Sequence, residues 1–312
     1  MKKRKIGCFL PAVLLSLLVI IGIAGYAGYA YFKVKGTADA IHEPIKGRSK
    51  SDLRNEDVSI KQQDAISVAL FGVDSNKDRL ATGDAGRSDS IVLLSINPDT
   101  KKAVMVSIPR DTYSEMAGKG TYEKIAHAYA YGGPDMAVKS VEKLMNVPVD
   151  YYATVNMDGM HEMVDAVGGI DVKSNATFTV KNYSFVEGET AHLDGDAALA
   201  FIRSRKEDGA GGDFGRQQRQ QLVIQGLAKK VLSVGSVTKL DSILGTVKGN
   251  VVTDITFDEL TGLRNGYAAT LDHVDKYQLQ GNGQILDDGL WYFMPDDAYK
   301  QQVTELYMDN LK

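Results

Sequence analysis

The sequence predicts a layered α/β domain behind a membrane anchor, and three observations lead to this prediction. Strand and helix patterns interleave from about residue 65 onward, as in layered α/β folds. The first strand, residues 65–73, is apolar almost throughout, which is typical of a strand covered on both faces. Residues 6–32 carry no charged side chain and follow a basic cluster at residues 1–5.

The N-terminal segment is long enough to cross a bilayer, since a membrane helix needs roughly 20 apolar residues. Basic residues stay on the cytoplasmic side, which places residues 1–5 inside and the domain outside. The alternative is a cleaved signal peptide, but the stretch exceeds the ~7–15 residues of a signal core and no clean A-x-A site follows it. We therefore expect a cytoplasmic tail (1–5), a transmembrane helix (6–32), an extracellular stalk (33–64) and one folded domain (65–312).

Composition narrows the function classes. The only cysteine, Cys8, lies in the predicted membrane helix, so the exported part has no disulfide and depends on its core. Residues 1–35 hold six of the 36 basic side chains and none of the 40 acidic ones, so the remainder is acidic. An acidic domain argues against nucleic-acid binding, which needs a basic face.

The elements follow in order from apolar patterning and turn residues. After the first strand, two more strands over 90–96 and 103–108 are joined by a turn at residues 97–100. Helical spacing predicts a helix over 135–145, and a strand over 151–155 follows. A helix over 157–167 ends at Gly168–Gly169, and a strand begins at residues 170–172.

The second half is expected to be more helical. We predict a short helix over 194–201 capped by Asp194, and the longest helix over 214–232. The C-terminal part mixes a helix over 257–267 with strands over 276–279 and 291–293.

Charged residues gather where the predicted strands begin and end. Asp74 ends the first strand, Arg87 and Asp89 lead into the second, and Arg110 and Asp111 follow the third. Strand ends are where ligand sites form in layered α/β domains. Three further cations and one amide complete the pattern: Arg203 and Arg205 lie on one side of the chain if it is extended, and Arg216 and Gln220 share a helix face.

These residue types indicate phosphate chemistry. Guanidinium groups match phosphate oxygens bidentately, and several in one cleft would repel one another without an anion. Asp74 and Asp89 could hold Mg²⁺, which favours carboxylates and substrate phosphates. Together they would stabilise phosphoryl transfer. The alternatives stay open here: Asp89 as a turn residue, Arg110 in a surface ion pair, and Arg203 and Arg205 on a solvated face.

The sequence lacks the common catalytic and metal-binding motifs. The chain has no Walker loop, nucleophile elbow or H-E-x-x-H, and its five histidines lack metal-ligand spacing. Residues 74–78 open like a calcium loop, but Arg79 and Ala85 stand where glycine and glutamate are needed.

Several segments together resemble the LytR-CpsA-Psr family of bacterial cell-wall phosphotransferases. The matching stretches, in order, are G-V-D (72–74), G-R-S-D-S (86–90), V-S-I-P-R-D-T-Y (106–113), K-I (124–125), H-A-Y-A-Y-G-G (127–133), V-G-G-I (167–170), R-S-R-K (203–206) and G-D-F-G-R-Q-Q-R-Q-Q (212–221). The short tail and single anchor are most similar to the teichoic-acid transferases of that family.

The resemblance implies a central mixed β-sheet flanked by helices, and an enzyme of the cell membrane of a Gram-positive bacterium. Such an enzyme moves a glycopolymer, here wall teichoic acid, from a polyprenyl-pyrophosphate carrier to the muramic acid 6-hydroxyl of peptidoglycan. By position, Asp74 and Asp89 match the Mg²⁺-associated acids. The pyrophosphate-binding set would be Arg87, Arg110, Lys124, Arg203, Arg205, Arg216 and Gln220. Asp74, Arg87, Asp89, Arg110 and Asp111 would be catalytic.

The prenyl chain would lie in an apolar tunnel, for which Val138, Leu144, Leu222 and Leu227 are candidates. Two departures from the family pattern stand close to the predicted site. Ala126 replaces an asparagine, and the loop 206–213 reads K-E-D-G-A-G-G-D without the usual proline and arginine, which predicts a looser and less charged loop. Three alternatives to the transferase are a polyprenyl-pyrophosphate phosphatase, a membrane-bound attenuator of transcription and a passive wall-polymer binding module. A cytoplasmic part of about five residues is too short for a DNA-reading fold.

Overall fold

The computed structural model describes residues 28–73, 86–157, 159–233 and 240–312. Their centre is a six-stranded sheet in the order β11–β6–β1–β2–β3–β12. β1 pairs antiparallel with β2 and parallel with β6, so the sheet is mixed, as expected. The six strands are β1 (Ile66–Val73), β2 (Ser88–Asn97), β3 (Lys102–Ile108), β6 (Tyr151–Asn156), β11 (Val251–Thr253) and β12 (Val274–Gln278).

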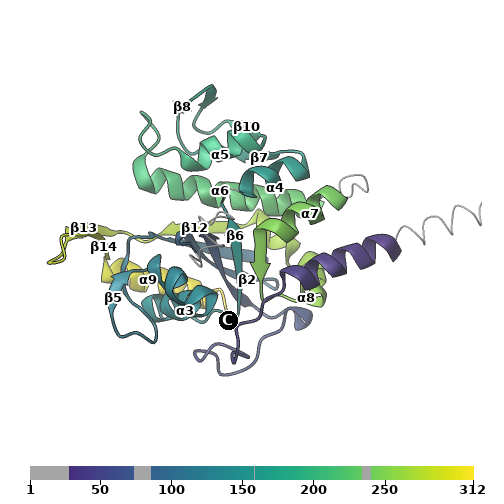
Figure 1. Cartoon of the computed structure of the whole chain (residues 1–312), viewed down its shortest axis with the longest axis horizontal. Helices are drawn as coiled ribbons and strands as arrows, with labels where there is room; N and C mark the ends of the chain where they lie inside the picture. The colour runs from purple at the N-terminus through teal and green to yellow at the C-terminus, as the bar shows by residue number, and fades with distance from the viewer. Residues whose placement is uncertain (1–27, 74–85, 158, 234–239) are drawn as a thin grey trace, which may run out of the picture.

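Helices cover both faces of this sheet, which confirms the layered α/β prediction (Figure 1). On one face lie α4 (Gly159–Val167), α5 (Gly195–Arg203), α6 (Gly212–Ser233) and α7 (Leu240–Asn250). On the other lie α3 (His127–Met145) and α9 (Asp297–Asp309), while α8 (Phe257–Gly262) flanks the end near β11 (Figure 1).

Each face has its own apolar core. Phe71, Leu93 and Val106 of the sheet pack with α3 and α9. The helix α9 closes this core, because Tyr307 is fully buried and its hydroxyl lies 2.6 Å from Ser67 Oγ of β1. A second core fills the space among α4, α5 and α6 and includes Phe201.

Local sequence explains where the helices begin. Asp194 accepts a hydrogen bond from the Ala197 amide and caps α5, as predicted. The predicted helix over 135–145 is only the second segment of α3, which starts at His127 and kinks at Gly132 and Gly133. Pro134 forces the kink, since a proline disfavours helical backbone in the residue before it, and Gly133 takes a φ of 60°.

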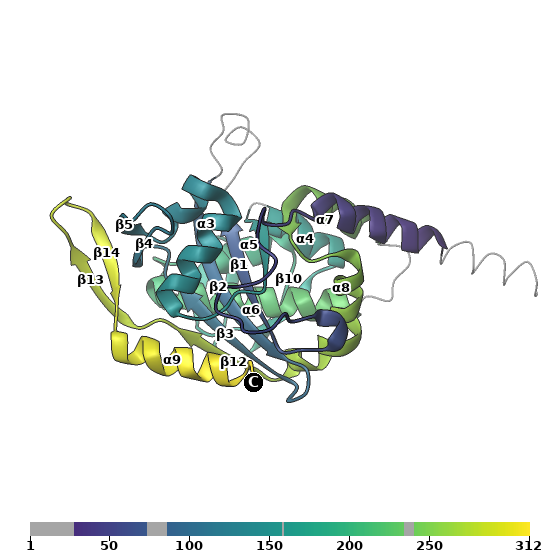
Figure 2. The same cartoon turned by 90° about the horizontal axis from the view of Figure 1, so that it is seen from below.

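The described residues also form four small two-stranded sheets outside the central one. They pair β4 (Tyr113–Glu115) with β5 (Tyr122–Lys124), β7 (Ile170–Lys173) with β10 (Thr190–Leu193), β8 (Phe178–Val180) with β9 (Tyr183–Phe185), and β13 (Gly281–Ile285) with β14 (Trp291–Pro295). The β13–β14 hairpin projects from the body as an arm (Figure 2).

The first described residues form a helix that leads into the domain. Residues 28–41 are helical and lie beside α7 and α8 (Figure 1), where the Tyr29 hydroxyl donates to Asp241 at 3.0 Å and the Tyr31 ring contacts the Phe257 ring edge-on. In the described part of the chain, no helix is both long and apolar enough to cross a membrane. Most of the predicted membrane helix, residues 6–27, lies outside the described residues.

The segment predicted as a stalk contacts the domain at several points. His42 bridges to Thr253 of β11. The buried pair Arg48–Glu142, at 2.7 Å, and the pair Arg54–Asp150, at 2.6 Å, attach it further along.

Candidate anion-binding site

The antiparallel pairing of β2 and β3 brings the first site residues together. Ile91 stands opposite Ile108, so continuing the register places Asp89 beside Arg110 at one edge of the sheet. Pro109 ends β3 and turns the chain, and Lys124 arrives from the β4–β5 hairpin, opposite Tyr113. Residues from three separate segments thus meet through backbone pairing alone.

Ion pairs join these residues into one network. Arg110 Nη1 donates to Asp89 Oδ1 at 2.7 Å, and Arg110 Nε lies 3.5 Å from Asp111 Oδ2. Lys124 Nζ lies 2.9 Å from the other Asp111 oxygen. Burial opposes the charge of Arg110, but attraction by Asp89 and Asp111 outweighs it and raises the pKa of Arg110.

The start of α6 supplies the second half of the site. Asp213 Oδ1 lies 2.6 Å from Arg216 Nη2 and 3.5 Å from Arg205 Nε. Burial lowers the pKa of Arg216, and the positive charges of Arg205 and Arg110 lower it further, against the attraction of Asp213 and Asp89. The charges of Arg110 and Asp89, as well as those of Arg205 and Asp213, therefore act on Arg216.

Two polar atoms at the start of α6 are buried without a hydrogen-bond partner among the described residues. They are Nε of Arg216 and Oε1 of Gln217. A buried donor without a partner is costly, and an anion would satisfy the one on Arg216. The site thus combines mutually repelling guanidinium groups with an unused donor, which is the arrangement that a diphosphate would stabilise.

The remaining predicted residues lie around this centre or outside the described chain. Arg87 is exposed just before β2. The hydrogen bond to Glu123 raises the pKa of Tyr131, and the nearby charge of Arg87 opposes this shift. Arg203 is exposed at the end of α5, and the buried Ser204 separates it from Arg205. Gln220 is buried on α6, one turn after Arg216. Asp74 lies outside the described residues.

Sequence reasoning missed two residues that organise the site. Asp213 holds Arg205 and Arg216 together, and its spacing of three residues from Arg216 on a helix was the available signal. Arg219 is fully buried and donates to the carbonyl oxygens of Phe201, Ser204 and Ala210. No local pattern separates this buried arginine from Arg216, which stands in the same motif.

Arg219 fixes the loop that carries Arg205. Its guanidinium also lies 4.6 Å from the centre of the Phe178 ring, and burial lowers its pKa to about 10. In the same loop, Gly209 has a φ of 80°, and a Cβ there would come within 2.1 Å of the Thr177 carbonyl oxygen. The departure at Ala126 lies beside Arg110, whose carbonyl accepts from the Ala126 amide.

The four candidates for one apolar tunnel do not lie together, which corrects that expectation. Val138 and Leu144 belong to the core on the α3 side, whereas Leu222 and Leu227 pack on the α4–α6 side. The sheet separates the two pairs, because α3 and α6 cover opposite faces (Figure 1).

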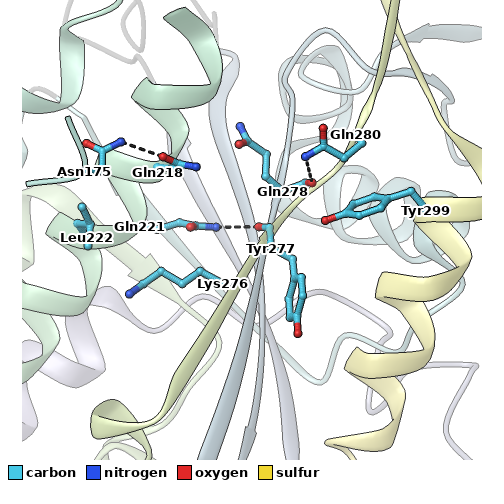
Figure 3. Close-up of a pocket in the computed structure, with 9 residues that line it drawn as sticks. All are labelled: Asn175, Gln218, Gln221, Leu222, Lys276, Tyr277, Gln278, Gln280 and Tyr299. Atoms are coloured by element: carbon cyan, nitrogen blue, oxygen red, sulfur yellow. Dashed lines mark hydrogen bonds between the residues drawn. The ribbon is translucent and has the colours of Figure 1, made fainter. Parts of the chain in front are cut away.

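A polar cavity of about 280 Å³ lies next to α6. Figure 3 shows it between α6, the edge strand β12 and α9. Gln221 of α6 donates hydrogen bonds to the Tyr277 carbonyl oxygen and to Ser107 Oγ, and these bonds connect the helix to the sheet. Apart from Lys276, its lining is uncharged: Asn175, Gln218, Gln221, Leu222, Tyr277, Gln278, Gln280 and Tyr299. It contains none of the predicted arginines, so it is separate from the predicted phosphate site.

The described residues contain no group of three or more histidine, cysteine, aspartate or glutamate side chains that could hold a metal ion. Asp89 is the one predicted metal ligand among them.

Comparison with known proteins places this arrangement in a family. The LytR_cpsA_psr family model matches residues 28–308. A polyisoprenyl-teichoic acid–peptidoglycan teichoic acid transferase TagU of Bacillus mycoides (strain KBAB4) is 42% identical over 287 residues, covering 92% of each chain. The protein of that name from Bacillus subtilis (strain 168) is 40% identical over 311 residues, covering 100% of this chain and 98% of the relative.

Solved structures agree. The crystal structure of B. subtilis TagU superposes with a TM-score of 0.66 at 38% identity, covering 80% of this chain and 97% of that one. A structure described as TagT bound to LIIa-WTA has a TM-score of 0.70 at 30% identity, covering 86% and 99%.

Proposed function

The chain belongs to the LytR_cpsA_psr family, and from this premise we propose that it transfers wall teichoic acid from a polyprenyl-pyrophosphate carrier to the muramic acid 6-hydroxyl of peptidoglycan. Relatives that are about two-fifths identical over nearly the whole chain carry the corresponding transferase name. The observation that carries the proposal is the convergence of Arg110, Arg205 and Arg216 around Asp89 and Asp213.

Each group of site residues has a separate role in the proposed reaction. Arg110, Arg205 and Arg216 bind the pyrophosphate, and they exchange their carboxylate partners for phosphate oxygens. The acceptor hydroxyl attacks the phosphorus that bears the glycan. The bond from that phosphorus to the bridging oxygen breaks, and polyprenyl phosphate leaves. The arginines neutralise the charge that spreads over the phosphoryl oxygens in the transition state.

A proton must leave the attacking hydroxyl. We assign it to the carboxylate of Asp111, because Asp89 is assigned to a metal ion. Lys124 and Arg110 hold the Asp111 carboxylate at 2.9 and 3.5 Å, which orients it at the end of β3. Arg87, Arg203 and Gln220 would line the outer parts of the same anion site.

Magnesium remains part of the proposal. Asp89 Oδ1 accepts from Arg110, and its other oxygen makes no hydrogen bond to another described residue. One or two carboxylates plus substrate phosphates are the donor set that Mg²⁺ prefers, so Asp89, together with Asp74, fits this ion. When bound, Mg²⁺ would offset phosphate charge. Chelation is expected to abolish transfer, and added Mg²⁺ to restore it.

Location completes the proposal. A membrane helix over residues 6–32 would hold the domain outside the cell, on the side where peptidoglycan lies. The helical residues 28–41 would continue it toward the domain.

The test is transfer by the full chain in detergent, with a lipid-linked donor and undecorated peptidoglycan. Arg110→Ala is expected to lower the rate of transfer on the order of 10²–10³-fold, because a preorganised charge on the transferring group is lost. Arg264→Ala, which removes an exposed arginine from η3 (Leu263–Tyr267), is the matched control and should retain full activity.

Two results would contradict the proposal. If Arg110→Ala transfers as fast as the wild type, Arg110 does not belong to the catalytic set. If polyprenyl phosphate is released equally with and without peptidoglycan, and no glycopolymer is attached, the protein is a phosphatase instead.

A further inference from the structure

The only tryptophan of the chain stands on the projecting arm. Trp291 is the first residue of β14, and 47% of it is exposed. Figures 1 and 2 both show the β13–β14 hairpin at the opposite end of the molecule from helix 28–41. Ile285 stands opposite Trp291 in the hairpin and is also exposed, and such a contiguous apolar patch on a projecting hairpin indicates an interaction surface.

Glycines in the partner strand shape this surface. A Cβ at Gly283 would come within 2.4 Å of Trp291 Nε1 and 2.6 Å of Cε2 and Cζ2, so the indole plane lies across the bare backbone of Gly283. At Gly281 an added Cβ would meet the Met294 carbonyl oxygen at 2.1 Å and the Phe293 Cζ at 2.9 Å. The indole is supported on one side, and its exposure is on the other.

The same hairpin face continues to the anion site. Trp291 and Phe293 are two residues apart on a strand and therefore share a face. The Phe293 ring centre lies 6.4 Å from that of Phe214, which follows Asp213 directly. The Phe293 amide also donates to the Asp111 carbonyl at 2.9 Å. A row of aromatic rings thus leads from the arginine site to Trp291.

Charge narrows the choice of ligand. The hairpin, residues 281–295, contains Asp287 and Asp288 and no lysine or arginine. An acidic arm is repelled by an anionic bilayer and by a polymer of phosphodiesters. A supported indole with one free face and an N–H group instead suits a flat, uncharged ring that carries hydroxyl groups.

We propose that Trp291 is a stacking platform for a pyranose ring of the acceptor glycan strand. The inference rests on the proposed function, because it names the surface that positions the acceptor beside the arginines. Trp291 is a positioning residue in this proposal and does not touch the transferring phosphate.

The experiment uses the single tryptophan as its own reporter. The full chain in detergent is titrated with soluble, undecorated glycan strands in the absence of donor, and fluorescence is excited where the tyrosines contribute little. Saturable quenching or a spectral shift is expected. Calorimetry then compares Trp291→Ala, Trp291→Tyr and, as a matched control, Leu290→Ser, which alters the exposed apolar neighbour.

Trp291→Ala should weaken glycan binding about two- to tenfold, the range for one aromatic contact, while Trp291→Tyr retains most of it. In the transfer assay, Trp291→Ala should raise KM for the acceptor by the same factor and leave kcat at saturating acceptor unchanged. If Trp291 had only a structural role, its replacement by alanine would not raise KM alone, and tyrosine would not restore glycan binding.

The inference is overturned if wild-type fluorescence does not respond to glycan although transfer proceeds. It is equally overturned if anionic phosphatidylglycerol vesicles, and not glycan, change the fluorescence. If glycan binds through Trp291 but no variant or wild type transfers polymer, the surface stands and the proposed function fails.

Discussion

Arg219 differs from the arginines around it in what it binds. Arg110, Arg205 and Arg216 pair with carboxylates at the site, whereas Arg219 donates only to backbone carbonyls in the interior. It holds the end of α5 against the loop that reaches α6. No carboxylate among the described residues pairs with this buried charge, and three carbonyl oxygens and an aromatic face replace water.

Replacing Arg219 tests this role. Arg219→Met should lower the free energy of unfolding by about 2–4 kcal/mol, because three buried carbonyls lose their donor. It should also slow transfer, since the backbone that carries Arg205 is released. Urea unfolding and the transfer assay measure the two effects, with Arg264→Met as the exposed control. An unchanged urea midpoint would show that the carbonyls find other donors.

Asp254 predicts a pH dependence of stability. Burial raises the pKa of this carboxyl to about 7, although its Oδ1 accepts from the Tyr152 amide at 2.8 Å. The unfolded chain titrates near 3.8, so the folded state holds the proton over the interval between the two values. Stability should therefore fall as pH rises from about 4 through about 7.

Asp254→Asn should remove this contribution while keeping the acceptor for Tyr152. We expect the variant to be more stable than the wild type at about pH 8, and the difference to shrink or vanish at about pH 5. Thermal unfolding at both pH values measures it. A constant difference across the range would mean that Asp254 does not titrate there.

At the scale of elements, the segment 42–64 is attached to the domain by buried charge. Glu142 of α3 accepts from Arg48, from Ser51 and from the Val149 amide, and both charged side chains are about nine-tenths buried. Removing one partner of such a pair leaves the other charge without compensation. The attachment therefore requires both members.

A double-mutant cycle tests the attachment. Arg48→Met should lower the free energy of unfolding by about 3–5 kcal/mol, whereas Arg48→Met with Glu142→Leu should recover most of the loss. Denaturant unfolding of the four proteins gives the coupling. Additive losses would show that the pair does not act as a unit.

Over the whole molecule, local pattern predicted the strands β1, β2, β3 and β6 well, because buried strands are apolar throughout. It could not show that the strand at 170–173 leaves the central sheet and pairs with β10, since pairing depends on distant segments. The first turns of α3, rich in alanine and tyrosine, lack apolar periodicity, and α9 was not predicted at all.

The sequence predicted which residues belong to the candidate site better than how they are arranged in space. Residues at strand ends pointed to Asp89, Arg110 and Asp111, and the β2–β3 register explains why they meet. Asp213 and Arg219 escaped because their roles come from loop packing. The aromatic row on the hairpin escaped because exposure of Trp291 and the gap at Gly283 exist only in three dimensions.

The place of Tyr307 bears on how the protein is made. Its hydroxyl meets Ser67 of β1 across 240 positions of sequence, and Val303 fills the same core. The helix α3 covers part of the inner face of β1 early, but the part around Ser67 waits for nearly the entire polypeptide. Synthesis at roughly 5–20 residues per second leaves that part open for many seconds. A nascent chain of this protein therefore leaves part of its first central strand uncovered until translation is almost complete.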